Sequence, residues 1–291
     1  MDFLQLIVSG LANGCVYGLI ALGFVLIYKA TETVNFAQGD FMMLGAFLCL
    51  GFTNAEFMGL SFWLAVPLAM ICMGIFGYLF DWGVLRPIAG QPQISIVVLT
   101  IAVGFVLRFA AGSIWTHEPV SLETPFAGQD IRAGGVVLGV DEIAIIVVTL
   151  LLTVLLYLYF SKTKLGVAMQ AASQNQLAAY YMGIPVKRMQ SLVWALSGVV
   201  AAVAGILFAS KGAIDPSAGL LGIKAFAAAA IGGFGSLPGA LLGGIIIGLV
   251  EPLSARYGPA GISQIAPYAI LLLVLIFRPG GIFSQTQRKK V

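Results

Sequence analysis

Five ionisable residues lie within or beside long apolar runs of this sequence. Arg108, Lys224 and Glu251 fall inside such runs, and Asp40 and Asp81 lie near the ends of others. A charged side chain at the centre of a bilayer costs about 2.5–3.5 kcal/mol on insertion scales, and such residues commonly mark a substrate or ion pathway. Only Glu251 is an acid deep enough in its run to suit a proton- or sodium-coupled carrier, so ion coupling is the less favoured chemistry.

Two of these charges are predicted to form a pair. If the segment GGFGSLPG turns the chain near Ser236, Lys224 and Glu251 lie on the order of 18 and 22 Å from the turn along ideal helices. They would then share a depth toward the outer side of the membrane, and pairing costs less than burying either charge alone. The alternative is that Lys224 extends to the outer headgroups while Glu251 reaches water independently.

A polar cluster precedes the second apolar run. Asn35, Gln38 and Asp40 stand where the first and second runs meet. Amide and carboxylate groups at the start of a helix can cap backbone N–H groups, and the helix dipole favours an acid such as Asp40 there. The same groups could instead contact a polar solute, so both roles remain open.

The sequence offers no recognisable catalytic centre. Its one histidine, His117, has no associated Ser–Asp arrangement, and Cys15, Cys49 and Cys72 lack metal-ligand spacing. The phosphate-binding pattern G-x-x-x-x-G-K-[ST] does not occur. We therefore predict no catalytic residue, no metal and no cofactor, and any ATP-driven work must come from a partner.

Composition predicts the elements that carry these residues. Of 291 residues, 60% are hydrophobic and 9% charged, and runs of about 17–25 apolar residues match a hydrocarbon core of about 30 Å. We expect an all-α integral membrane protein, a polytopic bundle of about 8–9 transmembrane helices in a single domain, 1–291. The predicted spans are 3–28, 41–57, 62–82, 94–115, 142–160, 191–210, 220–234, 237–252 and 265–277. The seventh and eighth are short and could instead be broken or re-entrant helices.

Charge distribution predicts the orientation of the spans. Lys and Arg are retained on the cytoplasmic side in short loops, and segment 162–188 holds four cations and no acid. If this segment is cytoplasmic, alternation places Arg86, Arg278 and the basic residues 288–290 on the same side. The N-terminus then faces out and the C-terminus faces in. The net charge of +3 reflects this topology rather than a nucleic-acid partner.

Glycine spacing predicts close helix packing. The chain contains 36 glycines, and small residues four positions apart give one helix face a groove in which another backbone can lie. Two such series are Gly10, Gly14 and Gly18, and Gly235, Gly239 and Gly243.

The basic segment 162–188 is predicted to contain one helix. Residues 165–182 are mostly good helix formers without proline, and Gly183 followed by Pro185 supplies a stop. Its alanines predict a smooth surface that another protein can approach. The alternative is an amphipathic helix held at the membrane surface by its lysines.

Five stretches of the sequence, taken in order, indicate a family. They are VNFAQGDFMMLGAF (34–47), LRPIAGQP (85–92), KLGVAMQAASQNQLAAYYMGIPVKR (164–188), GIKAFAAAAIGGFGSLPGALLGGIIIGLVE (222–251) and FRPGGIF (277–283). Together they resemble the LivH-type permeases of branched-chain amino acid ABC transporters, over nearly the whole chain. The third stretch is similar to the coupling helix of such importers.

The resemblance implies a permease domain that works with partners in the bacterial inner membrane. Those partners are a LivM-like second permease subunit, two ATP-binding cassette subunits and a periplasmic substrate-binding protein, with membrane lipid around them. It implies a coupling role for Lys164, Leu165, Gly166, Ala168, Ala171, Ala172, Gly183 and Ile184. Asn35, Gln38 and Asp40 belong to a motif characteristic of that family, and together with Lys224 and Glu251, which the charge argument singles out, they are assigned a pathway or structural role. The segment departs from the EAA-type pattern of other ABC permeases, because no Glu precedes Ala171.

Three functions are compared on this basis. The first is an importer subunit, not itself an enzyme, for branched-chain or related amino acids. The second is a permease or passive channel for urea, short amides or other small solutes. The third is an intramembrane enzyme, which the lack of a catalytic constellation disfavours.

Overall fold

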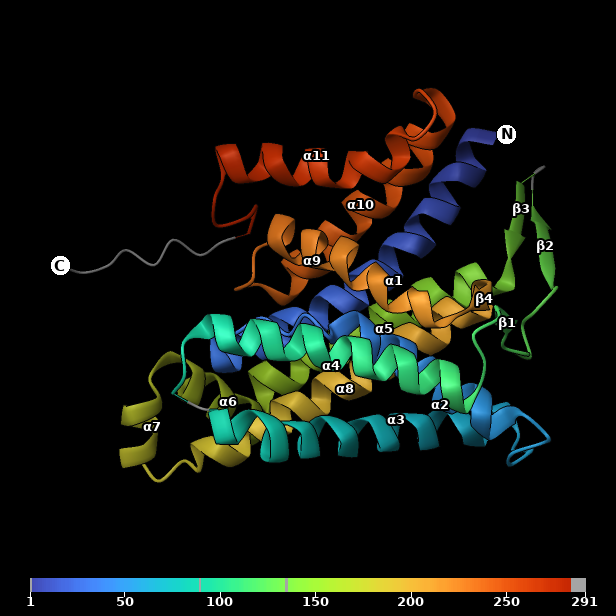
Figure 1. Ribbon diagram of the computed structural model, residues 1–291. Helices are drawn as coiled ribbons and strands as arrows, with labels where there is room; N and C mark the ends of the chain where they lie inside the picture. Colours follow the sequence, from blue (N-terminus) through green and yellow to red (C-terminus); the bar gives the residue numbers. More distant parts are fainter. Residues whose placement is uncertain (1, 89, 134–135, 284–291) are drawn as a thin grey trace.

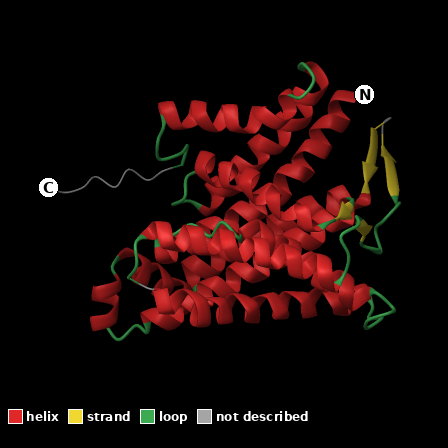
Figure 2. Ribbon diagram, in the orientation of Figure 1, coloured by secondary structure: helices red, strands yellow, loops and turns green. Residues whose placement is uncertain are grey.

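The computed structural model describes residues 2–88, 90–133 and 136–283, and the basic residues 288–290 lie outside them. Each predicted span coincides with a helix (Figures 1 and 2). These helices are α1 (Asp2–Thr31), α2 (Gln38–Thr53), α3 (Phe62–Phe80), α4 (Gln93–Ile114), α5 (Val140–Lys162), α8 (Val186–Lys211), α9 (Leu221–Gly232), α10 (Leu237–Tyr257) and α11 (Ile262–Phe277).

The bundle has two distinct ends. At one end, β1 (Val120–Ser121) pairs with β4 (Ala213–Ile214), and β2 (Asp130–Ala133) pairs with β3 (Val136–Gly139), close to the N-terminus (Figure 1). At the other end lie the short helices α6 (Lys164–Gln174) and α7 (Gln176–Tyr181). We call these the strand end and the α6–α7 end.

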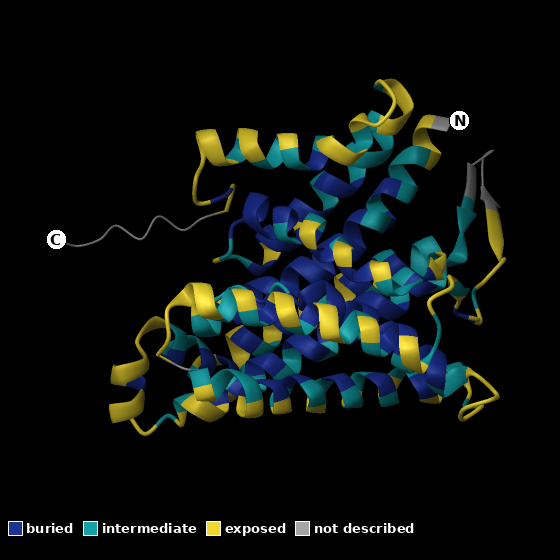
Figure 3. Ribbon diagram, in the orientation of Figure 1, coloured by how far each residue is buried: buried dark blue, intermediate teal, exposed yellow. Residues whose placement is uncertain are grey.

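The core of the bundle is formed by its central helices. In α1, 89% of the most apolar stretch is buried, against 17% in α4 (Figure 3). The outward side chains of α3 and α5 are apolar as well, among them Trp63, Ile71, Leu151 and Leu155. Within the described chain, six helices are long and apolar enough to cross a membrane, whereas α2, α9 and α11 are shorter. This arrangement is that of an integral membrane helical protein.

The glycines of α1 allow it to lie directly against α10. A Cβ added at Gly14 would lie 2.7 Å from the Cα of Ile245, and Gly10 and Gly18 also face α10. Gly239 and Gly243 lie close to the backbone of α9. The prediction was wrong for Gly235, which sits in the turn between α9 and α10, where an added Cβ would meet nothing within 4 Å.

The prediction of one helix through 165–182 was also wrong. The chain breaks at Asn175, whose backbone is extended and whose side chain accepts a hydrogen bond from the Ala178 N–H at 2.9 Å. Asn is a preferred N-cap residue because its side-chain oxygen satisfies a free N–H of the first turn. The segment therefore forms α6 and α7, and the predicted stop at Gly183 holds, with φ of +80°.

Candidate functional site

The two amides of the predicted polar cluster are fully buried and join three helices. Asn35 Nδ2 donates to Gln38 Oε1 at 3.1 Å, and Asn35 Oδ1 accepts from the Ala37 N–H at 3.1 Å. The hydroxyl of Ser197 in α8 lies 3.1 Å from Gln38 Oε1 and 3.2 Å from the carbonyl oxygen of Gly23 in α1. Asn35 thus closes the turn that precedes α2, whose N-cap residue Ala37 has no side-chain cap, and Gln38 links the start of α2 to α1 and α8.

Asp40 has a partner that the sequence did not indicate. Arg108 of α4 donates from Nε to Asp40 Oδ1 at 2.6 Å and from Nη2 to Oδ2 at 3.3 Å. The Asp40 residue is 1% exposed. Gly104 of α4 and Gly219 of the 3-10 helix η3 (Pro216–Leu220) leave room for this carboxylate. The pair therefore ties α2 to α4, and η3 packs against it at Gly219.

Lys224 and Glu251 form the predicted ion pair. The Nζ of Lys224 lies 2.5 Å from Glu251 Oε1, and this confirms the pairing. The second oxygen, Oε2, accepts a hydrogen bond at 2.8 Å from the hydroxyl of Tyr17 in α1. Both charged side chains are about one-fifth exposed, at 21% and 23%. Tyr17 was not singled out in the sequence, since a tyrosine in an apolar run has no distinguishing pattern.

A second cation is held at the strand end. Lys211, the last residue of α8, lies 3.2 Å from Glu142 of α5. Its Nζ also donates to Ser9 Oγ and to Asn13 Oδ1, both at 2.9 Å, on α1. These contacts join three helices that are far apart in the chain.

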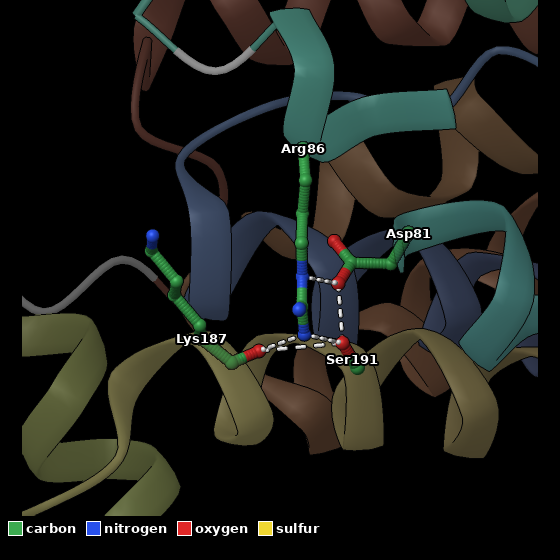
Figure 4. Close-up of polar contacts among 4 residues, drawn as sticks. All are labelled: Asp81, Arg86, Lys187 and Ser191. Carbon is green, nitrogen blue, oxygen red and sulfur yellow. Dashed lines mark hydrogen bonds and ion pairs between the residues drawn. The ribbon is translucent and has the colours of Figure 1, made fainter. Parts of the chain in front are cut away.

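A polar network lies at the α6–α7 end, where α3 meets α8 (Figure 4). After α3, the chain forms a π-helical turn, η1 (Asp81–Leu85), and then a 3-10 turn, η2 (Arg86–Ile88). Arg86 Nη2 donates to the Lys187 carbonyl at 3.0 Å and to Ser191 Oγ at 2.6 Å, while Nε lies 3.4 Å from Asp81 Oδ2. Ser191 donates to Asp81 Oδ2 at 2.5 Å. This network fixes the first turns of α8, which directly follow the α6–α7 segment.

Only some of the alanines of the α6–α7 segment face outward as predicted: Ala178 is exposed. Ala172 and Ala179 are buried, and Gly166 packs against the backbone at Tyr159 and Phe160. Among the other predicted coupling residues, Lys164, Leu165 and Gly183 are exposed, and Ala168, Ala171 and Ile184 are half-buried. The outward apolar side chains are instead Leu177, Tyr180, Tyr181 and Met182. Gly166, Ala172 and Ala179 lie inward, where small residues let the short helices approach the bundle.

The described residues contain no arrangement of three His, Cys, Asp or Glu side chains that could hold a metal ion. The charged and polar groups instead satisfy one another across helix boundaries. Such a bundle can offer polar groups to a solute within an apolar frame.

Comparison with known proteins assigns the family. The sequence profile described as "Branched-chain amino acid transport system / permease component" matches residues 6–277. The chain belongs to this family. The resemblance to LivH-type permeases is thereby confirmed, and the chain is a multi-pass membrane protein of a transporter permease family.

Individual relatives of this permease agree over its whole length. It is 33% identical to the high-affinity branched-chain amino acid transport system permease protein BraD of Pseudomonas aeruginosa, across 99% of this chain and 98% of that one. It is 29% identical to LivH of Escherichia coli K12 over the same shares. The permease is also 23% identical to LivM of Salmonella typhimurium, covering 94% of this chain and 68% of LivM.

The fold of the permease has a counterpart among solved structures. A chain of PsaBC from Streptococcus pneumoniae, in complex with Fab, superposes with a TM-score of 0.51 and 14% sequence identity, covering 94% of this chain and 92% of that one. At this identity the likeness concerns the fold alone.

Proposed function

We propose that this chain is the transmembrane permease subunit of an ABC importer that carries branched-chain or related amino acids across the bacterial inner membrane. The main support is the match to permeases of that transport system over residues 6–277, together with 33% identity to BraD over nearly the full length. ATP hydrolysis belongs to two ATP-binding cassette subunits. A LivM-like permease completes the membrane part, and a periplasmic binding protein delivers the substrate.

In this proposal the α6–α7 end faces the cytoplasm. Basic residues gather in the elements at that end, namely Arg86, Lys162, Lys164, Lys187 and Arg188. Acidic residues lie in the elements of the strand end, including Glu118, Asp130, Asp141 and Asp215. Retention of Lys and Arg on the cytoplasmic side supports this orientation.

The proposed contact with the ATPases is an exposed apolar patch, which we call the docking patch. It consists of Leu177, Tyr180, Tyr181 and Met182, and Tyr181 and Met182 are 77% and 83% exposed. Large apolar and aromatic side chains are typical anchors of protein interfaces. The chain enters α8 four residues after Met182, and Ser191 of α8 is bonded to Asp81 and Arg86 at the end of α3. A displacement of α7 would therefore be transmitted to α8 and α3.

The docking patch can be tested with a charge at its most exposed residue. Met182→Glu should reduce both the co-purification of the ATPase subunits and the uptake of leucine, while the permease stays folded. Met58→Glu is the matched control, because Met58 is 61% exposed in the loop before α3 at the opposite end. Buried Ala172 is unsuitable, since a bulky change there perturbs packing first.

Two outcomes would count against the proposal. If Met182→Glu retains the ATPases and transports like the control, the docking patch is not the coupling surface. If the permease subunits alone, reconstituted without ATPases, allow leucine or urea to equilibrate, the protein is a passive channel. The substrate itself is best identified by measuring which amino acid the associated binding protein binds.

A further inference from the structure

The Lys224–Glu251 pair joins the short apolar helix α9 to α10, a helix long and apolar enough to cross a membrane, and it is partly exposed. Each side chain keeps about one-fifth of its surface exposed, at 21% and 23%. Ionisable groups within a membrane face the interior of an assembly or a water-filled space rather than lipid, because hydrocarbon cannot solvate them. The surface around this pair is therefore expected to adjoin such a space in the assembled transporter.

The depth of the pair suits the side from which substrate arrives. Glu251 lies six residues before Tyr257, the last residue of α10, or about 9 Å from the strand end of that helix. Lys224 is in the first turn of α9, which has 12 residues and follows the 3-10 helix η3.

We propose that the Lys224–Glu251 pair is a binding site for the two charged groups of a zwitterionic amino acid during transport. The Lys224 ammonium pairs with the substrate carboxylate, and the Glu251 carboxylate pairs with the substrate ammonium. Each fixed charge exchanges one partner for another, so no charge is left unpaired in a poorly solvated place. This inference rests on the proposed function and specifies its substrate class.

The three side chains at this site are suited to such an exchange. Lys224 has a flexible side chain that can leave Glu251 for another carboxylate. Tyr17 holds the other oxygen of Glu251 at 2.8 Å, so the carboxylate keeps its orientation while Lys224 moves. The Lys224 ammonium also lies 6.0 Å from the centre of the Tyr17 ring, a contact that favours a cation there.

A purely structural link between α9 and α10 explains the pair less well. The two helices already lie close together toward the α6–α7 end, where Gly239 and Gly243 face Gly232 and Ala228. Buried ion pairs are commonly no more stabilising than well-packed apolar residues of the same size. An apolar contact would thus join these helices equally well and would not need Tyr17 as a third partner.

The test measures binding of radiolabelled leucine to the assembled transporter in lipid nanodiscs, without binding protein. Competitors are leucinamide, which keeps only the ammonium, and 4-methyl-2-oxopentanoate, which keeps only the carboxylate. Each charge-assisted contact contributes about tenfold in affinity, so wild type should prefer leucine to either analogue by about tenfold. Lys224→Met/Glu251→Gln should reduce that preference to about twofold or less.

A matched pair and a milder variant separate binding from folding. Lys211→Met/Glu142→Gln removes a second lysine–glutamate pair of the same bundle and should keep the wild-type preference. Tyr17→Phe should weaken leucine and leucinamide, which both use Glu251, and leave 4-methyl-2-oxopentanoate unchanged. Equal weakening of all three ligands would indicate a structural role and overturn the inference.

Two further results would overturn the inference without touching the proposed function. In the first, the wild-type complex hydrolyses ATP with its loaded binding protein yet binds no leucine on its own. In the second, Lys224→Met/Glu251→Gln keeps the full wild-type preference for leucine over the two analogues. Failure of the wild-type permease to assemble with ATP-binding subunits would instead contradict the proposed function.

Discussion

Removal of the charge at Asp40 is expected to destabilise the bundle. Asp40 is 1% exposed and receives two hydrogen bonds from Arg108, at 2.6 and 3.3 Å. Breaking a buried ion pair by removing one partner costs about 3–5 kcal/mol, because the other charge stays uncompensated. In Asp40→Asn the remaining charge is Arg108, whose side chain is 23% exposed, so we expect the lower figure, about 3 kcal/mol.

The opposite change should cost more. Arg108→Met leaves the almost fully buried Asp40 carboxylate alone, and the expected loss is about 5 kcal/mol. In Asp40→Asn/Arg108→Met neither charge remains, so the double loss should be at most about 5 kcal/mol rather than the additive value of about 8 kcal/mol. The coupling free energy would then be about 3 kcal/mol.

The measurement is unfolding of the purified permease in mixed micelles with increasing dodecyl sulfate, followed by tryptophan fluorescence. The amount of assembled transporter in membranes is measured in parallel. Two results would refute the pairing energy. One is a loss of unfolding free energy below about 1 kcal/mol in each single variant, which is the value of an exposed pair. The other is a loss in the double variant that equals the sum of the two single losses. Normal assembly of Asp40→Asn with lost transport would assign Asp40 to the pathway instead.

Four further substitutions test three local features. Gly14→Ala should cost about 1–3 kcal/mol by forcing α1 from the Ile245 backbone, whereas Gly235→Ala should stay within about 0.5 kcal/mol; equal thermal unfolding of the two variants would contradict this. Asn175→Ala removes the cap of α7 and should cost about 1 kcal/mol locally, seen as faster hydrogen exchange over 176–181 and not over α5. Ser191→Ala should cost about 1–3 kcal/mol by leaving Asp81 and Arg86 short of one partner; an unchanged melting temperature would argue against that network.

Local properties of the chain were sufficient to predict the long apolar helices and part of the site. A helix that crosses a membrane must satisfy its backbone hydrogen bonds internally and present apolar side chains to lipid. Its length and position can therefore be predicted from the apolar runs of the sequence. The spacing of Gly10, Gly14 and Gly18 predicted the contact face of α1, because residues four apart lie on one side of a helix. The pairing of Lys224 with Glu251 could be predicted because one short turn connects α9 to α10. The distance of each residue from that turn then follows from the number of residues between them.

Contacts between distant segments depended on the tertiary structure. Asp40 and Arg108 are 68 residues apart, and Lys211 reaches Glu142 across separate helices. The helices could pack in several ways that satisfy the same apolar pattern, so their sequence positions did not identify these partners. The outward face of the α6–α7 segment was likewise decided by the bundle, which needs Gly166 and Ala172 for close approach and leaves Tyr181 and Met182 outside. Composition predicted a membrane bundle because hydrophobicity is a property of each segment, whereas charge pairing depends on which segments become neighbours.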